Sequence, residues 1–386
     1  MMKSILIVDL DPIAEQGTIG GVELVVVRMA KVLAANGYHV SVLNSIESSE
    51  KIILTGCRNI ECISLNVTIK TDFRYKILKR LAHSLGCNIP GRCYYNAYSL
   101  RILKKFLCSN NFDLIINNRP FHVPLLLGAK KPDVPLIQMM HGAPQRFDAF
   151  CHGLWQGVGN SLKQVNAIQV LLPSYENYFR KIYSGDIYVI PNAIMQLPDS
   201  ELSEINCRTK KIIYAARYAD NKQQDVIVTV FKTLAERFPD WEVDFYGTIG
   251  RKVYVDNLQK DIKSNRLEKQ ILFKGYTNNV YSVYKQASIC VFPSKNEGFG
   301  MSLAEAMTCG IPSIGFKQCS GVNELIEDKV TGFLVDNVEE FTDRLKQLME
   351  DKELRERMGR KAHERAKKYD EEIVWKQWLN LIKRYV

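Results

Sequence analysis

The sequence has no run of apolar residues that approaches the ~18 needed for a membrane-spanning helix. The apolar run among the first residues, MMKSILIVDLD, is too short for the core of a secretory signal, and Asp9 and Asp11 interrupt it. We therefore expect this run to be the first β-strand of a cytoplasmic protein.

The sequence also lacks any ordered pattern of cysteines. Its ten cysteines include no C-x-x-C pair and follow no regular spacing. Zinc sites and disulfide frameworks both depend on such spacing, so neither is expected. We expect reduced thiols, most of them buried.

Acidic residues are scarce in the first half of the chain. Residues 1–195 contain 21 Lys and Arg against 13 Asp and Glu, and they carry most of the net charge of +10. A basic half of this kind indicates an anionic partner, such as a membrane surface, a phosphorylated lipid or nucleic acid. No recognised nucleic-acid-binding module accompanies the charge, so we expect no nucleic-acid partner.

The segment 70–105 is the most basic part of the chain, with Asp72 as its only acid and with aromatic and leucine residues interleaved. One interpretation is a solvated helix face, and the other is a basic, aromatic surface that binds an anionic membrane. The residues alone leave both open. The cations are Lys70, Arg74, Lys76, Lys79, Arg80, Arg92, Arg101, Lys104 and Lys105.

Strand-like and helix-like segments alternate along the 386 residues, which are 46% apolar. This length and composition suffice for two α/β domains with separate cores. Domains are predicted at 1–195 and 211–370, joined by a polar linker at 196–210. Buried strands separated by helices predict two doubly wound, Rossmann-like domains that face each other across a cleft. Strands are predicted at 4–8, 38–43, 112–117, 135–140, 167–172, 187–191, 211–216, 242–247, 270–274, 289–292 and 333–335, and residues 338–382 are strongly helical.

The stretch 287–309, ASICVFPSKNEGFGMSLAEAMTC, combines a strand, a glycine-containing turn and a helix start. Such a unit presents backbone N–H groups and a positive dipole end at the carboxyl edge of a sheet, which is suited to an anion. Glu297 and Glu305 flank the turn. Because carboxylates suit hydroxyl groups rather than phosphate, we expect the ligand to carry both.

With Arg217 and Lys222, the spacing of Glu297 and Glu305 (E-x7-E) resembles retaining glycosyltransferases of the family 4 type, which have the GT-B fold. Similar segments occur in the expected order along nearly the whole chain. They are Gly20-Gly21-Val22-Glu23, Ile190-Pro191-Asn192-Ala193, Gly275, Pro293-Ser294 and Val330-Thr331-Gly332-Phe333-Leu334-Val335. The resemblance also implies that a C-terminal helix, 371–386, crosses back to the N-terminal domain.

The resemblance implies roles for particular residues. Arg217 and Lys222 would hold the diphosphate, Glu305 the ribose hydroxyls and Glu297 the donor sugar, with Glu324 a weaker candidate. His141 would lie near the donor sugar and, with Arg217, Lys222 and Glu297, form the catalytic group. The remaining donor-binding residues would be Gly20, Gly21, Gly247, Phe299, Gly300, Met301, Ser302 and Leu303.

Asp9-Leu10-Asp11 spells D-x-D, the metal-binding signature of a different glycosyltransferase fold, GT-A. Here it ends the first strand of a doubly wound domain, which is not its place in that fold. The resemblance to GT-B enzymes also implies that the nucleotide is bound without a metal, so we expect no metal site and no cofactor.

Together with these features, the resemblance implies a retaining, metal-independent hexosyltransferase. Its donor would be a nucleoside diphosphate sugar, with UDP preferred over GDP, and its acceptor a lipid-linked or oligosaccharide glycan of bacterial surface polysaccharide synthesis, such as lipopolysaccharide or capsule. The enzyme would lie on the inner face of the cell membrane as a peripheral protein. The alternatives are a GT-B nucleotide-sugar epimerase, a glycogen-synthase-like enzyme and a catalytically silent scaffold of a glycan assembly complex.

Overall fold

A computed structural model of the chain describes residues 2–10, 20–44, 54, 56–65, 97–144, 147, 156–202 and 209–386. The chain divides into two compact units. Unit 1 comprises Met1–Asn192 together with Val374–Val386, and unit 2 comprises Ala193–Ile373.

Unit 1 is built on a seven-stranded sheet with the order β3-β2-β1-β4-β5-β6-β7, and every strand pair is parallel. The strands are β1 (Ser4–Asp9), β2 (His39–Asn44), β3 (Ile60–Ser64), β4 (Leu114–Asn117), β5 (Leu136–Met140), β6 (Ala167–Val170) and β7 (Asp186–Val189). The helical segments between them are α1 (Gly21–Ala35), α4 (Ala97–Ser109), η1 (Pro120–His122), α5 (Val123–Ala129), α7 (Gln156–Leu162) and α8 (Pro173–Phe179).

Unit 2 contains a six-stranded parallel sheet with the order β10-β9-β8-β11-β12-β13. Its strands are β8 (Lys211–Ala215), β9 (Glu242–Tyr246), β10 (Ile271–Gly275), β11 (Ile289–Phe292), β12 (Ser313–Phe316) and β13 (Gly332–Val335). Its helical segments are α9 (Gln224–Lys232), α10 (Lys252–Ser264), α11 (Val280–Gln286), α12 (Met301–Thr308), α13 (Val322–Leu325), α14 (Val338–Glu350), α15 (Lys352–Ala366) and η3 (Lys367–Tyr369), and α16 (Glu371–Ile382) follows.

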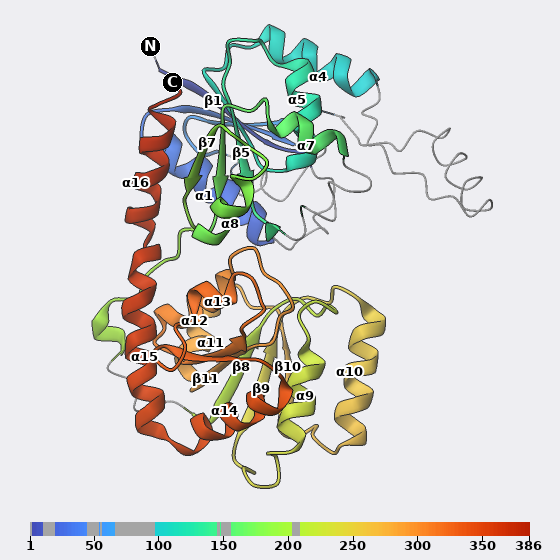
Figure 1. Ribbon diagram of the computed structural model, residues 1–386, viewed down its shortest axis with the longest axis vertical. Helices are drawn as coiled ribbons and strands as arrows, with labels where there is room; N and C mark the ends of the chain where they lie inside the picture. The colour runs from blue at the N-terminus through green and yellow to red at the C-terminus, as the bar shows by residue number, and fades with distance from the viewer. Residues whose placement is uncertain are drawn as a thin grey trace, which may run out of the picture. The chain divides into compact units, whose positions relative to one another are not determined.

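Both sheets confirm the prediction of two doubly wound, Rossmann-like domains. Central strands such as β4, β5, β6 and β11 are buried along their whole length, because helices cover both faces of each sheet (Figure 1). In unit 2, α9 contacts α10 and α14, whereas α12 contacts α11, α13 and α15.

The strand order reverses direction once in each sheet, and this places the two ligand-binding edges. In unit 1 the reversal lies between β1 and β4, and in unit 2 it lies between β8 and β11. In doubly wound sheets, ligands bind outside the carboxyl ends of the strands at this point, because the following helices leave toward opposite faces.

The predicted helical stretch 338–382 is helical nearly throughout and comprises α14, α15, η3 and α16. Side-chain caps mark two of the starts. The Asn337 Oδ1 accepts a hydrogen bond from the Glu340 N–H at 2.9 Å, and the Asp351 Oδ1 accepts one from the Leu354 N–H at 2.8 Å. Such caps satisfy N–H groups that the first turn of a helix leaves without partners.

The end of the chain packs within unit 1. The Tyr385 hydroxyl donates to Asp186 Oδ2 at 3.1 Å, and the Arg384 guanidinium lies 5.6 Å from the centre of the Tyr188 ring. Trp375 and Trp378 are buried.

Most of the basic segment 70–105 lies outside the described residues, so the structure does not choose between its two interpretations. Its described end belongs to α4, where Arg101, Lys104 and Lys105 are exposed while Leu103 and Leu107 are buried. Among the described residues, no helix combines the length and the apolar character needed to cross a membrane.

Candidate functional site

Four loops meet at the carboxyl edge of the unit 2 sheet, after β8, β9, β11 and β12. Backbone hydrogen bonds connect them. The Lys295 N–H donates to the Asn221 carbonyl at 2.9 Å, and the Glu297 N–H donates to the Ser320 carbonyl at 3.0 Å. The loop after β9 joins through the Tyr218 N–H, which donates to the Thr248 carbonyl at 2.9 Å. These bonds connect the loops that carry the predicted site residues of unit 2.

Lys222 and Glu297 form an ion pair at this edge, with 2.5 Å between the Lys222 Nζ and the Glu297 Oε1. Their side chains are only 20% and 11% exposed, so water screens the pair weakly. The structure therefore brings together two of the predicted catalytic residues, which are 75 positions apart in the sequence.

The Tyr214 side chain supports this pair by bonding to the backbone of Lys222, and this residue was not predicted from the sequence. Its buried hydroxyl donates to the Lys222 carbonyl at 2.9 Å and lies 2.8 Å from the Ser294 Oγ. Burial, with the charge of Glu297 as a lesser cause, holds the pKa of this phenol well above its usual value. The hydroxyl thus stays protonated and joins the loop after β8 to the loop after β11.

Replacing Tyr214 with Phe should lower the free energy of unfolding by about 1–3 kcal/mol, because two polar groups lose a buried partner. It should also lower kcat, because the backbone of Lys222 loses its support. Tyr218→Phe is the matched control, since the buried Tyr218 hydroxyl donates to the Phe245 carbonyl at 3.0 Å and does not contact Lys222. Urea unfolding and steady-state kinetics test this. Equal kcat values for the two variants would contradict the role of Tyr214.

Arg217 is exposed just after β8, and the loop after β9 packs against its backbone. Gly247 makes this approach possible. An ideal Cβ on Gly247 would lie 2.1 Å from the Ala216 carbonyl oxygen, and its φ of +155° is in the region that favours glycine. Because Gly247 has no side chain, the loop after β9 can lie against the backbone that positions Arg217. Gly247 itself could contact a ligand only through its backbone.

The N-terminus of α12 points its first-turn N–H groups at the same edge. Gly300, with φ +91°, lets the chain turn into the helix, and the first helical bond runs from the Ala304 N–H to the Gly300 carbonyl at 3.0 Å. The N–H groups of Met301, Ser302 and Leu303 precede that bond, so no helical carbonyl accepts from them. This arrangement suits an anion.

Three predicted donor-binding side chains serve the structure instead of facing a ligand. The Ser302 hydroxyl donates to the Ala215 carbonyl at 2.6 Å and so ties α12 to the end of β8. The Phe299 ring is buried in a T-shaped contact with Tyr369, with ring centres 5.0 Å apart, and Leu303 is fully buried. These residues can reach a ligand through their backbone N–H groups.

Glu305 lies in the second turn of α12 and is 8% exposed. Its charge helps to hold the pKa of the buried Tyr284 above its usual value, although burial is the main cause. A carboxylate with so little exposed surface can offer a ligand only one edge, which is compatible with a pair of neighbouring hydroxyls. Glu324 lies on α13, where its carbonyl accepts from Arg365 Nη2 at 3.0 Å.

Gly20, Gly21 and His141 form a separate group at the carboxyl edge of unit 1. Gly20 is the N-cap of α1, which Gly21 begins, and His141 follows β5 directly. The His141 Nε2 contacts the Asn118 Oδ1. Burial and, secondarily, the charge of Arg119 lower the pKa of His141 to about 3, so the ring is neutral.

Asp9, the first acid of the D-x-D sequence, is 2% exposed, and its carboxylate is hydrogen-bonded by other protein groups. Its carboxylate accepts from the Arg119 Nε at 3.0 Å and from the Asn118 Nδ2 at 3.0 Å. Asp11 lies outside the described residues. Asp9 is therefore an ion-pair partner within unit 1.

One cluster among the described residues has donor atoms close enough for a metal ion: Asp199, His363 and Glu364. Lys367 already supplies a cation there, with its Nζ 3.1 Å from the Asp199 Oδ1 and 2.8 Å from the Glu364 Oε1. We therefore interpret the cluster as an ion-pair network.

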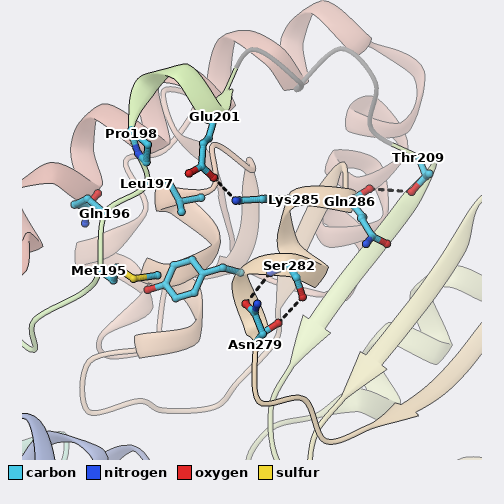
Figure 2. Close-up of a pocket in the computed structure, with 11 residues that line it drawn as sticks. Met195, Gln196, Leu197, Pro198, Glu201, Thr209, Asn279, Ser282, Lys285 and Gln286 are labelled. Atoms are coloured by element: carbon cyan, nitrogen blue, oxygen red, sulfur yellow. Dashed lines mark hydrogen bonds and ion pairs between the residues drawn. The ribbon is translucent and has the colours of Figure 1, made fainter.

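A pocket of about 650 Å³ lies within unit 2, between the segment 195–201 and α11 (Figure 2), and no residue of these loops lines it. Its polar groups mostly bond one another. Glu201 pairs with Lys285, the Asn279 side chain caps α11, and the Thr209 hydroxyl donates to the Gln286 carbonyl at 2.8 Å. None of the predicted site residues lines it, so this pocket is separate from the candidate site at the carboxyl edge of the unit 2 sheet.

The fold is that of the GT-B glycosyltransferases. The Anabaena protein HepE, in a crystal structure with UDP and glucose, matches with a TM-score of 0.75 and 19% identity, over 99% of this chain and 100% of that chain. Residues 19–195 match the family described as Glycosyltransferase Family 4, and residues 199–365 match Glycosyl transferases group 1. The two matches support a GT-B glycosyltransferase of the family 4 type.

Two curated relatives are bacterial transferases. Poly(ribitol-phosphate) alpha-N-acetylglucosaminyltransferase of Staphylococcus aureus is 29% identical over 178 residues, which is 45% of this chain and 36% of that protein. N-acetylgalactosamine-N,N'-diacetylbacillosaminyl-diphospho-undecaprenol 4-alpha-N-acetylgalactosaminyltransferase of Campylobacter jejuni is 30% identical over 172 residues, 44% of this chain and 45% of that protein. The chain spans between 30% and 56% of the length of the three curated relatives it matches first.

Proposed function

We propose that the protein is a retaining, metal-independent glycosyltransferase that moves a hexose or N-acetylhexosamine from a UDP-sugar to a glycan acceptor. The observation that carries the proposal is the group of Arg217, Lys222, Glu297 and the first turn of α12 at the strand reversal of unit 2. Cations and N–H donors beside carboxylates match the charges of a nucleoside diphosphate sugar.

Transfer breaks the bond between the anomeric carbon and a phosphate oxygen, so negative charge grows on the departing diphosphate. Groups that are already in place for this charge stabilise the transition state more than the ground state. Arg217 and Lys222 would supply the cations, and the N–H groups of Met301 and Ser302 the neutral donors. Because these groups supply positive charge, we propose that no divalent cation is needed.

Glu297 is not assigned as a covalent nucleophile. Its pairing with Lys222 at 2.5 Å stabilises the carboxylate charge and so lowers its nucleophilicity. We propose instead that the acceptor hydroxyl attacks from the side on which UDP leaves. The new bond joins the acceptor oxygen to the anomeric carbon, and the departing phosphate oxygen takes the hydroxyl proton.

We propose a lipid-linked acceptor in bacterial surface-glycan synthesis and a peripheral position on the cytoplasmic face of the membrane. The name of the Campylobacter jejuni relative includes a diphospho-undecaprenol acceptor, and the Staphylococcus aureus relative is named for a poly(ribitol phosphate). The excess of 21 cations over 13 acids in the first 195 residues agrees with an anionic surface.

The test is a panel of UDP-, GDP- and ADP-sugars incubated with the purified protein, with and without polyprenyl-diphosphate-linked oligosaccharides. We expect one UDP-sugar to be consumed, UDP to be released and the acceptor to gain one sugar of retained anomeric configuration, with EDTA present. Formation of the C2 epimer of the donor without an acceptor would identify an epimerase. Absence of any turnover would favour the alternative that the protein is a catalytically silent scaffold of a glycan assembly complex.

Membrane binding has its own test in the basic segment. Replacing Lys76, Lys79 and Arg80 with Glu should weaken binding to phosphatidylglycerol vesicles about 100-fold or more, since each cation near an anionic surface contributes about 1 kcal/mol. Cosedimentation measures this. The control reverses the same number of charges on α15 of unit 2, at Lys352, Arg357 and Arg360. Equal binding of both variants would exclude 70–105 as the anchor.

A further inference from the structure

A continuous series of hydrogen bonds runs along the carboxyl edge of unit 1 and ends at His141. The His141 Nε2 contacts the Asn118 Oδ1, and the Asn118 Nδ2 donates to the Asp9 Oδ2 at 3.0 Å. Arg119 completes the series, with its Nε 3.0 Å from the Asp9 Oδ1 and its Nη2 2.7 Å from the Glu23 Oε1. Asp9 and Asn118 are 2% and 1% exposed, so protein groups and not bulk water satisfy them.

The chemistry of Asp9 determines the direction of the whole series. The ion pair with Arg119, whose Nε lies 3.0 Å from the Asp9 Oδ1, favours the ionised carboxylate of Asp9. An ionised carboxylate only accepts hydrogen bonds, so the amide nitrogen of Asn118 must face Asp9. The amide oxygen of Asn118 then faces the ring, and His141 can bond it only by donating from Nε2–H. Burial raises the pKa of Asp9, and the Arg119 guanidinium opposes that rise by stabilising the carboxylate.

We propose that Asn118 is a positioning residue that holds His141 as the neutral Nε2–H tautomer and leaves Nδ1 as a hydrogen-bond acceptor, with Asp9 and Arg119 fixing the orientation of Asn118. The role in transfer rests on the proposed function: the acceptor at Nδ1 would receive a hydrogen bond from a sugar hydroxyl. A neutral acceptor nitrogen repels phosphate oxygens, so His141 recognises the sugar and not the diphosphate.

The tautomer can be observed without any turnover. In protein labelled with ¹⁵N-histidine, two-bond ¹H–¹⁵N spectra distinguish a protonated Nε2 from a protonated Nδ1, and His141→Gln identifies the signals. We expect the wild type to show a protonated Nε2 and an unprotonated Nδ1 at pH 7. Asn118→Ala should show a mixture of tautomers. A wild type with Nδ1–H, or with both nitrogens protonated, would overturn the proposal.

Kinetics test whether the tautomer matters. Asn118→Ala should lower kcat about tenfold, the equivalent of one hydrogen bond, while KM for the donor stays within about twofold. The control is Gln169→Ala on β6, because Gln169 is a similarly buried amide whose Nε2 donates to the Ile190 carbonyl at 2.5 Å and which is not part of the series. It should lose comparable stability with unchanged kcat. A mixed tautomer in Asn118→Ala with wild-type kcat would overturn the positioning role.

The two proposals fail in different ways. An inactive wild type that still shows the Nε2–H tautomer would refute the proposed function and retain the tautomer assignment. An active wild type with the opposite tautomer would refute only the present inference.

Discussion

Replacing Lys222 with Met should lower kcat about 100- to 1,000-fold, because one preorganised group that stabilises developing charge typically contributes about 3–4 kcal/mol to the barrier. The lysine lies 2.5 Å from Glu297 at the carboxyl edge of β8 and β11, and its own backbone is held by Tyr214. Steady-state kinetics at a saturating donor concentration measure the effect.

The matched control is Lys210→Met. Lys210 also pairs with a carboxylate, that of Asp240, but the pair is exposed and precedes β8 at the opposite edge of the sheet. Exposed pairs of this kind contribute little, so we expect kcat and stability to change only slightly. A Lys222→Met enzyme with kcat within threefold of wild type would contradict the assignment of Lys222 to the diphosphate.

Gly247→Ala should destabilise unit 2 by about 3 kcal/mol or more, because strain and a backbone clash act together. The added Cβ would lie 2.1 Å from the Ala216 carbonyl oxygen, at a φ of +155°. Relief of the clash would displace the backbone that carries Arg217, so kcat should fall as well. Differential scanning fluorimetry should show a drop in Tm of about 6–12 °C.

Gly275→Ala is the control that separates the two effects, because it introduces backbone strain without a clash. Gly275 has φ +73°, and an added Cβ there would meet no atom within 4 Å. Only the left-handed conformation then opposes the substitution, at a cost of about 1–2 kcal/mol. If the two alanine variants had the same Tm, the close approach at Gly247 would not be what requires a glycine.

Much of the fold follows from the sequence because strands buried on both faces are nearly continuous apolar runs. Ser4–Asp9 and Ile289–Phe292 are examples. The strand β3, with the sequence IECIS, gave no such signal. Among the described residues it lies at the edge of the sheet, pairs with β2 alone and is half-exposed, so it needs no apolar run.

The sequence predicts a group of residues at the unit 2 edge, because Arg217, Lys222 and Glu297 follow strands that the periodicity predicts, and the structure pairs Lys222 with Glu297. Tyr214 escaped prediction, since a tyrosine within a strand usually belongs to the core and its contact with Lys222 depends on the fold of the loop. Asn118 and Arg119 escaped for a similar reason. Their partner Asp9 is 109 and 110 positions away, and only the pairing of β1 with β4 brings them together.

Isothermal titration calorimetry of UDP against the wild type and Glu305→Gln tests the central claim most directly, which is that the carboxyl edge of β8 and β11 binds a nucleoside diphosphate. Glutamine keeps the size of the side chain and removes its charge, and hydrogen bonds to charged groups contribute about 1.5–3 kcal/mol. We predict measurable binding by the wild type and at least about tenfold weaker binding by Glu305→Gln, with unchanged Tm. Equal affinity of the two proteins for UDP would contradict the site.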